Sequence, residues 1–70
     1  MTDPTIAGFH VGQQVRVNAP ADGARGILGY IVQIDRGSSG VWFNVDISAA
    51  KHSKRPVIIT VSANQIKATL

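Results

Sequence analysis

The stretch that decides the fold is FHVGQQVRV, residues 9–17, followed by GARGILGYIV, residues 23–32. Both segments are rich in the β-branched and aromatic residues that favour strands. The connecting residues, 18–22, include a proline and end at the Asp-Gly pair of residues 22 and 23, so this part of the chain favours a turn. The sequence therefore predicts two strands joined by a loop that contains glycine.

The first predicted strand alternates between apolar and polar residues. Val11, Val15 and Val17 are expected on one face of an extended chain, and the polar residues between them on the other. In the second strand, Gly29 interrupts an apolar run from Ile27 onward. Glycine at such a place predicts a sharp bend or a bulge, which small barrels use to close on themselves.

The rest of the chain contains three more predicted strands. Residues 36–40 form a turn, and in residues 41–47 valine, phenylalanine and isoleucine alternate with Trp42, Asn44 and Asp46. Residues 57–61 form a fourth strand. Residues 62–65 have the length of one helical turn, and residues 66–70 form a short closing strand.

This order predicts an all-β, SH3-like small barrel of about five strands with a one-turn helix before the last strand. We expect residues 1–8 to be a flexible lead-in and residues 9–70 to be one domain. Barrels of this type are used mainly for binding.

The composition limits the chemistry that is available. The 70 residues contain no cysteine and only two histidines, His10 and His52, far apart in the sequence, so we expect neither a disulfide nor a metal site. We expect no cofactor. Residues 1–5 lack the features of a secretory signal, and the apolar run of residues 27–34 is too short to cross a bilayer. We therefore expect a cytoplasmic protein that does not bind membranes.

Basic residues are concentrated in one predicted loop. The formal net charge is +3, which favours anionic partners. A surface with several cations binds the phosphates of RNA or DNA with an affinity that depends on salt. Alternatively, the loop only keeps an apolar barrel soluble. The candidate phosphate-binding residues are Lys51, His52, Lys54 and Arg55 in the loop, with Arg25 and Arg36 in other turns.

Trp42 is expected on the outer face of its strand. There it can stack on a base, and we include it among the candidate nucleic-acid-binding residues. Alternatively, it packs in an interface between proteins, either a homo-oligomer or a complex with another protein. The candidate interface residues are Tyr30, Trp42, Ile58 and Thr60.

No catalytic arrangement is evident. Asp35 and Asp46 could approach across a hairpin, but both are also explained as solubilising residues at strand ends, and the chain has no glutamate. The glycines at positions 23, 26 and 29 do not form a phosphate-binding loop, because a strand follows them rather than a helix. We expect a protein that is not an enzyme.

Residues 12–34 resemble the KOW motif of ribosomal and transcription-elongation proteins. The matching elements are Gly12, Val15 and Val17, then Gly23 and Gly26, and the apolar strand after them. The resemblance implies an SH3-like barrel that contacts RNA or another protein through its loops. Of the basic residues that the family carries beside the glycines, this chain has only Arg25.

The same region is also similar to the plasmid-borne type II dihydrofolate reductases, which are tetramers of an SH3-like barrel. Residues 9–16 and 27–30 have counterparts there, and residues 57–60 fall at the Val-Gln-Ile-Tyr active-site motif. In this chain, Ile58 and Thr60 replace the glutamine and tyrosine, and Val17 replaces a lysine. The resemblance thus implies the fold and an oligomer, but not the enzyme activity.

The sequence favours a small, non-catalytic binding module for RNA or DNA. The alternative is an assembly module that forms a homo-oligomer through its Trp42 face. A reductase-like tetramer with another ligand in its pore is the third hypothesis.

Overall fold

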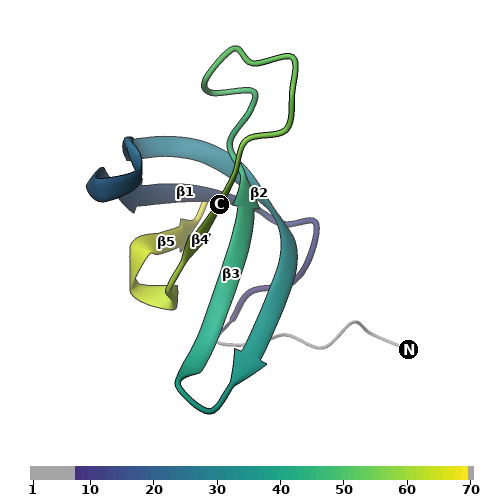
Figure 1. Ribbon diagram of the computed structural model, residues 1–70, viewed down its shortest axis with the longest axis vertical. Helices are drawn as coiled ribbons and strands as arrows, with labels where there is room; N and C mark the ends of the chain where they lie inside the picture. Colours follow the sequence, from purple (N-terminus) through teal and green to yellow (C-terminus); the bar gives the residue numbers. More distant parts are fainter. Residues whose placement is uncertain (1–7, 70) are drawn as a thin grey trace.

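The computed structural model describes residues 8–69, so that most of the predicted lead-in lies outside the described residues. Five strands form one antiparallel sheet in the order β4-β3-β2-β1-β5, which curls into a small barrel (Figure 1). Two short 3-10 turns, η1 and η2, complete the described chain. The elements are β1 (Gln14–Ala19), η1 (Pro20–Asp22), β2 (Ala24–Gly37), β3 (Gly40–Asp46), β4 (Ile58–Val61), η2 (Ala63–Gln65) and β5 (Ile66–Ala68).

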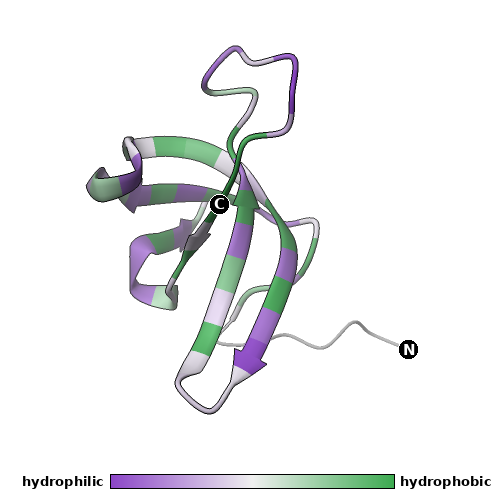
Figure 2. Ribbon diagram, in the orientation of Figure 1, coloured by the Kyte–Doolittle hydropathy of each residue, from purple (hydrophilic) through white to green (hydrophobic). Residues whose placement is uncertain are grey.

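The core lies on the inner face of this curled sheet. Alternate residues of the strands point inward, and hydropathy alternates along β2 and β3 accordingly (Figure 2). Phe43 is the largest fully buried side chain, and Phe9 packs against it edge-on, with ring centroids 5.4 Å apart. The buried apolar residues are Val15, Val17, Ala19, Ala24, Ile31, Phe43, Val45, Ile47, Val61 and Ile66.

Two β-bulges interrupt the pairing of the long strand β2. Gly26 is the extra residue opposite β1, and its φ of +64° is one that glycine adopts without strain. Val32 is the extra residue opposite β3. Gly29 itself is in regular register opposite Val15, so of the bend or bulge predicted there, the bulge is wrong. Glycine is required there for another reason, since a Cβ at this position would lie only 2.7 Å from Cγ1 of Val45.

The prediction for Val11 is also wrong. Val15 and Val17 are fully buried, but Val11 is 54% exposed. The reason is Gly12, whose φ of +91° turns the chain, so that the regular alternation begins only with β1. The N–H of Gly12 donates to the carbonyl of Ile31 at 2.7 Å, which fixes this turn beside β2.

The predicted one-turn helix is present as η2. Ser62 and Gln65 cap it reciprocally, and the N–H of Ser62 donates to Oε1 of Gln65 at 3.0 Å. The chain then enters β5, which pairs with β1. The fold is thus the predicted all-β, SH3-like small barrel of five strands. Its outer sheet face and the loop between β3 and β4 carry most of the polar residues, and the outer face also carries the exposed rings of Tyr30 and Trp42.

Candidate functional site

A basic groove crosses β1 and β5 on the outer face of the sheet. Arg16 and Lys67 are directly opposite each other in the register of these two strands, and both are exposed. Nη1 of Arg16 donates to the carbonyl of Gly26 at 2.7 Å, which holds the guanidinium at the bulge. The groove has a volume of about 350 Å³ and is lined by Arg16, Asn18, Gly26, Asn64, Gln65 and Lys67.

The two opposed cations of this groove, Arg16 and Lys67, repel each other in the free protein. Like charges that face each other across two strands destabilise a sheet. An anion between Arg16 and Lys67 removes this repulsion. The amide groups of Asn18, Asn64 and Gln65 supply further neutral donors. The groove is therefore suited to a phosphate group.

The basic loop, residues 48–56, folds back toward the start of β2. The N–H of Ile47 donates to the carbonyl of Val57 at 2.8 Å, which closes the base of the loop. Nζ of Lys51 donates to the carbonyl of Gly23 at 2.6 Å. Since Arg25 follows two residues later, this hydrogen bond brings the loop close to the beginning of β2.

The predicted phosphate-binding residues therefore separate into two groups. Lys51, His52, Lys54 and Arg55 are all exposed in the basic loop, and Arg25 is exposed at the start of β2, two residues after the Gly23 carbonyl that Lys51 contacts. In contrast, Arg36 precedes the turn at residues 37–40, which lies at the opposite end of the molecule from the loop (Figure 1). Trp42 is at the start of β3, directly beside that turn.

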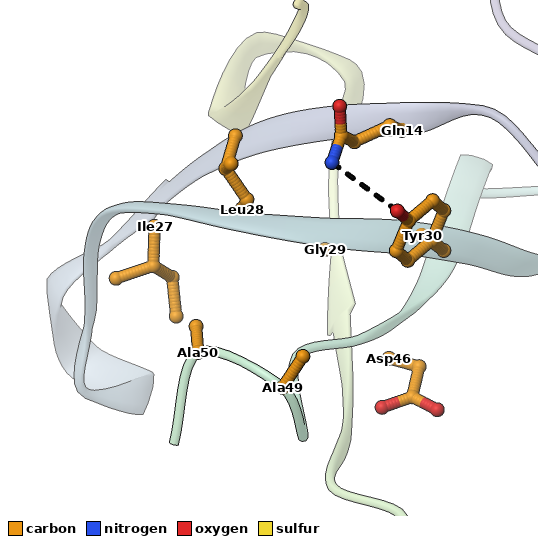
Figure 3. A pocket seen from close by; sticks show the side chains of 8 residues that line it. All are labelled: Gln14, Ile27, Leu28, Gly29, Tyr30, Asp46, Ala49 and Ala50. Carbon is orange, nitrogen blue, oxygen red and sulfur yellow. Dashed lines mark hydrogen bonds between the residues drawn. The ribbon is translucent and has the colours of Figure 1, made fainter. Parts of the chain in front are cut away.

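A second cavity lies between β2 and the beginning of the basic loop (Figure 3). The backbone at Gly29 lies between Leu28 and Tyr30, and the loop residues Ala49 and Ala50 lie opposite. The cavity, which we name the Tyr30 pocket, has a volume of about 350 Å³. Its lining consists of Gln14, Ile27, Leu28, Gly29, Tyr30, Asp46, Ala49 and Ala50.

Two polar groups of the Tyr30 pocket are oriented by hydrogen bonds. Nε2 of Gln14 donates to Oη of Tyr30 at 3.3 Å, although Tyr30 remains 48% exposed. Oδ1 of Asp46 accepts the N–H of Ser48 at 2.8 Å. Hydrogen bonds from Ser48, with a smaller contribution from the backbone of Val57, hold the pKa of the Asp46 carboxyl below its ordinary value. Asp46 is therefore an acceptor at neutral pH.

The predicted interface residues lie on one face. In register, Tyr30 is opposite Asp46 of β3, which is opposite Ile58 of β4. Thr60 is opposite Asn44 and donates to its Oδ1 at 2.7 Å. Trp42 lies two residues before Asn44 and is 40% exposed. We name Tyr30, Trp42, Ile58 and Thr60 the Trp42 face.

Asp35 and Asp46 are not brought together. Asp35 pairs with Trp42, four residues before Asp46 on the same strand, and such a separation along a strand is about 13 Å. Both oxygens of Asp35 accept amide N–H groups, from Gln33 at 2.9 Å and Asn44 at 3.0 Å. This carboxylate organises a polar network on the sheet surface.

Sequence reasoning missed Arg16 and Lys67. The alternation of apolar and polar residues in β1 already indicates that Arg16 lies on the outer face of the sheet. Its partner lies in the last strand, however, and the register between two strands so distant in the chain follows from the closure of the barrel. No local pattern indicates that the two cations are opposite each other.

No cluster of three His, Asp or Glu side chains suited to a metal ion occurs within residues 8–69. The same part of the chain contains no helix with the length and apolarity needed to cross a membrane. No family model matches the chain, and no curated protein or solved structure is significantly similar to it.

Proposed function

We propose that this domain binds single-stranded RNA or DNA through the outer face of β1, β2 and β5. The observation that carries the proposal is the opposed pair of Arg16 and Lys67, which borders an exposed tyrosine. Arg16 is directly opposite Leu28 in the register of β1 and β2, so the basic groove and the Tyr30 pocket adjoin. One continuous surface thus offers phosphate contacts and a stacking platform.

The two components act on different parts of a nucleic acid. Cations neutralise phosphates and release condensed counterions, which provides affinity without regard to sequence. An aromatic ring stacks on an unpaired base and contributes about 1–3 kcal/mol. Arg25 and the cations of the basic loop extend the positive surface past the Tyr30 pocket. The bound nucleic acid is expected to be single-stranded, because Tyr30 can stack only on the exposed face of an unpaired base.

The direct test is a salt titration with a matched pair of variants. We expect the affinity for a labelled, mixed-sequence 12-nucleotide single strand, measured by fluorescence anisotropy, to fall linearly on a log-log plot against salt. The slope changes by about 0.7 for each contacted phosphate. Lys67→Glu should weaken binding about fivefold at low salt and make the slope shallower by at least about 0.7.

Arg36→Glu is the control, because it reverses one charge at the far end of the molecule. We expect it to leave the slope of the salt dependence unchanged. If Lys67→Glu and Arg36→Glu weakened binding equally, only net charge would matter, and the basic groove would not be the binding surface. An affinity that did not respond to salt would also contradict the proposal.

A second candidate function is self-assembly through the Trp42 face. The observation that favours it is that Trp42 and Ile58, 40% and 53% exposed, lie on the same face as Tyr30 and Thr60. Exposed apolar side chains on one face of so small a domain are typical of contact surfaces. Burial of apolar area between copies stabilises the folded state by about 25 cal/mol per Å².

Light scattering distinguishes this second function. We expect an assembly module to show a mass that rises with protein concentration, and Trp42→Ala to shift it toward the monomer. Val11→Ala is the control, because Val11 is also an exposed apolar residue but lies in the turn before β1. A wild-type mass that remains that of a monomer at all concentrations would exclude assembly through this face.

A further inference from the structure

The Tyr30 pocket owes its open space to two small residues of the loop. Ala49 and Ala50 lie across from the backbone of Gly29, and neither side chain fills the space between them (Figure 3). The apolar side chains of Ile27 and Leu28 and the ring of Tyr30 line the rest. A cavity of about 350 Å³ with apolar walls and a few polar groups is suited to a small flat ring.

The polar groups of the pocket restrict which ring fits. Asp46 is ionised at neutral pH and accepts hydrogen bonds only. A carboxylate offers about four lone-pair positions, so the hydrogen bond from the N–H of Ser48 leaves capacity for further donors. Two adjacent N–H groups on one edge of a ring match the two oxygens of a carboxylate.

We propose that the Tyr30 pocket binds a guanine base of the single strand, with Asp46 accepting hydrogen bonds from its N1–H and its exocyclic amine. This inference rests on the proposed function. Guanine is the base whose pairing edge presents two neighbouring N–H donors. Adenine and cytosine present one amine beside an unprotonated nitrogen, and uracil presents one N–H between two carbonyl oxygens, which a carboxylate repels.

The cations around the pocket are consistent with a nucleotide in this position. Arg16 lies opposite Leu28 at one wall, and Lys51 directly follows Ala50 at the other. Both are exposed, and Lys51 is held toward β2 by its hydrogen bond to Gly23. The phosphates on the two sides of a bound nucleotide thus meet positive charge, while Asp46 is the acidic residue that lines the pocket itself.

The experiment uses four heptanucleotide RNAs that differ only at the central base. Three contain guanosine, adenosine or cytidine within uridines, and the fourth is all uridine. We expect the wild-type domain to bind the guanosine strand about tenfold more tightly than the all-uridine strand. Asp46→Asn should reduce this preference to less than about twofold.

Two further variants make the result specific. Asp35→Asn removes the same charge outside the pocket and should retain the preference for guanosine. Ala50→Leu fills the cavity and keeps Asp46, and it should abolish the preference even if Asp46→Asn disturbs the loop. Circular dichroism spectra verify that each variant is folded.

The outcomes separate the two proposals. If the wild-type domain binds all four strands equally and with salt dependence, the guanine site is refuted and the proposed function remains. If it binds none of them, both fail. A preference that survives in Asp46→Asn or in Ala50→Leu refutes the guanine site. A change of oligomeric mass in Ala50→Leu without a change of base preference would assign the pocket to a contact between copies of the chain.

Discussion

Phe43→Ala is expected to remove about half of the free energy of unfolding of the domain. Phe43 is fully buried in β3, and Phe9 packs against its ring. Truncation of a buried phenylalanine to alanine costs about 3–5 kcal/mol, because it removes apolar contacts and leaves a cavity. The total stability of a 70-residue domain is about 4–10 kcal/mol, so this one side chain accounts for much of it.

Urea denaturation followed by circular dichroism measures the effect. Phe43→Leu is the matched control, since leucine fills most of the volume and should cost less than about 1.5 kcal/mol. The chain has no cysteine with which to form a disulfide, so its stability depends on such packing. A loss below about 1 kcal/mol in Phe43→Ala would mean that the ring is not central to the core.

The strands could be predicted because alternation is a local property. In β3, Phe43 and Val45 are buried as predicted, and Trp42 is exposed on the opposite face. The fold class followed from the order of such segments. This reasoning failed at Val11. The apolar pattern extends back to Val11, but the positive φ of Gly12 turns the chain, so the regular strand begins only after this glycine.

The separation of Trp42 from the basic loop was already implied by the strand pattern. Trp42 is near the start of β3, and the loop begins after the end of that strand. Trp42 lies four residues before Asp46, the last residue of β3, and at about 3.3 Å per residue this separation is about 13 Å. For the proposed nucleic-acid binding, Tyr30, which is closer to the loop, is therefore the better candidate for stacking.

The basic groove and the Tyr30 pocket could not be predicted, because both depend on long-range pairing. Arg16 meets Lys67 only through the register of β1 and β5, and Lys51 meets Gly23 only because the loop folds back. Sequence patterns specify which face a residue takes. They do not specify which residue from a distant strand lies beside it.

Gly29→Ala is expected to destabilise the domain by about 2 kcal/mol, because it overpacks the contact between β2 and β3. An added Cβ would lie 2.7 Å from Cγ1 of Val45 and 2.8 Å from the carbonyl oxygen of Asp46. The side chain can shift, but the carbonyl belongs to the backbone of β3 and cannot move without the strand. Thermal or urea unfolding measures the loss.

Gly37→Ala is the matched control for this prediction. A Cβ at Gly37 meets nothing within 4 Å, and its φ is not positive, so alanine should be neutral or slightly stabilising. Equal stability of the two variants would contradict the close approach at Gly29.

Gly29→Ala is also expected to change base preference through the same contact. Because relief of the clash displaces the backbone of Asp46, Gly29→Ala should lose the preference for guanosine even under conditions in which it remains folded.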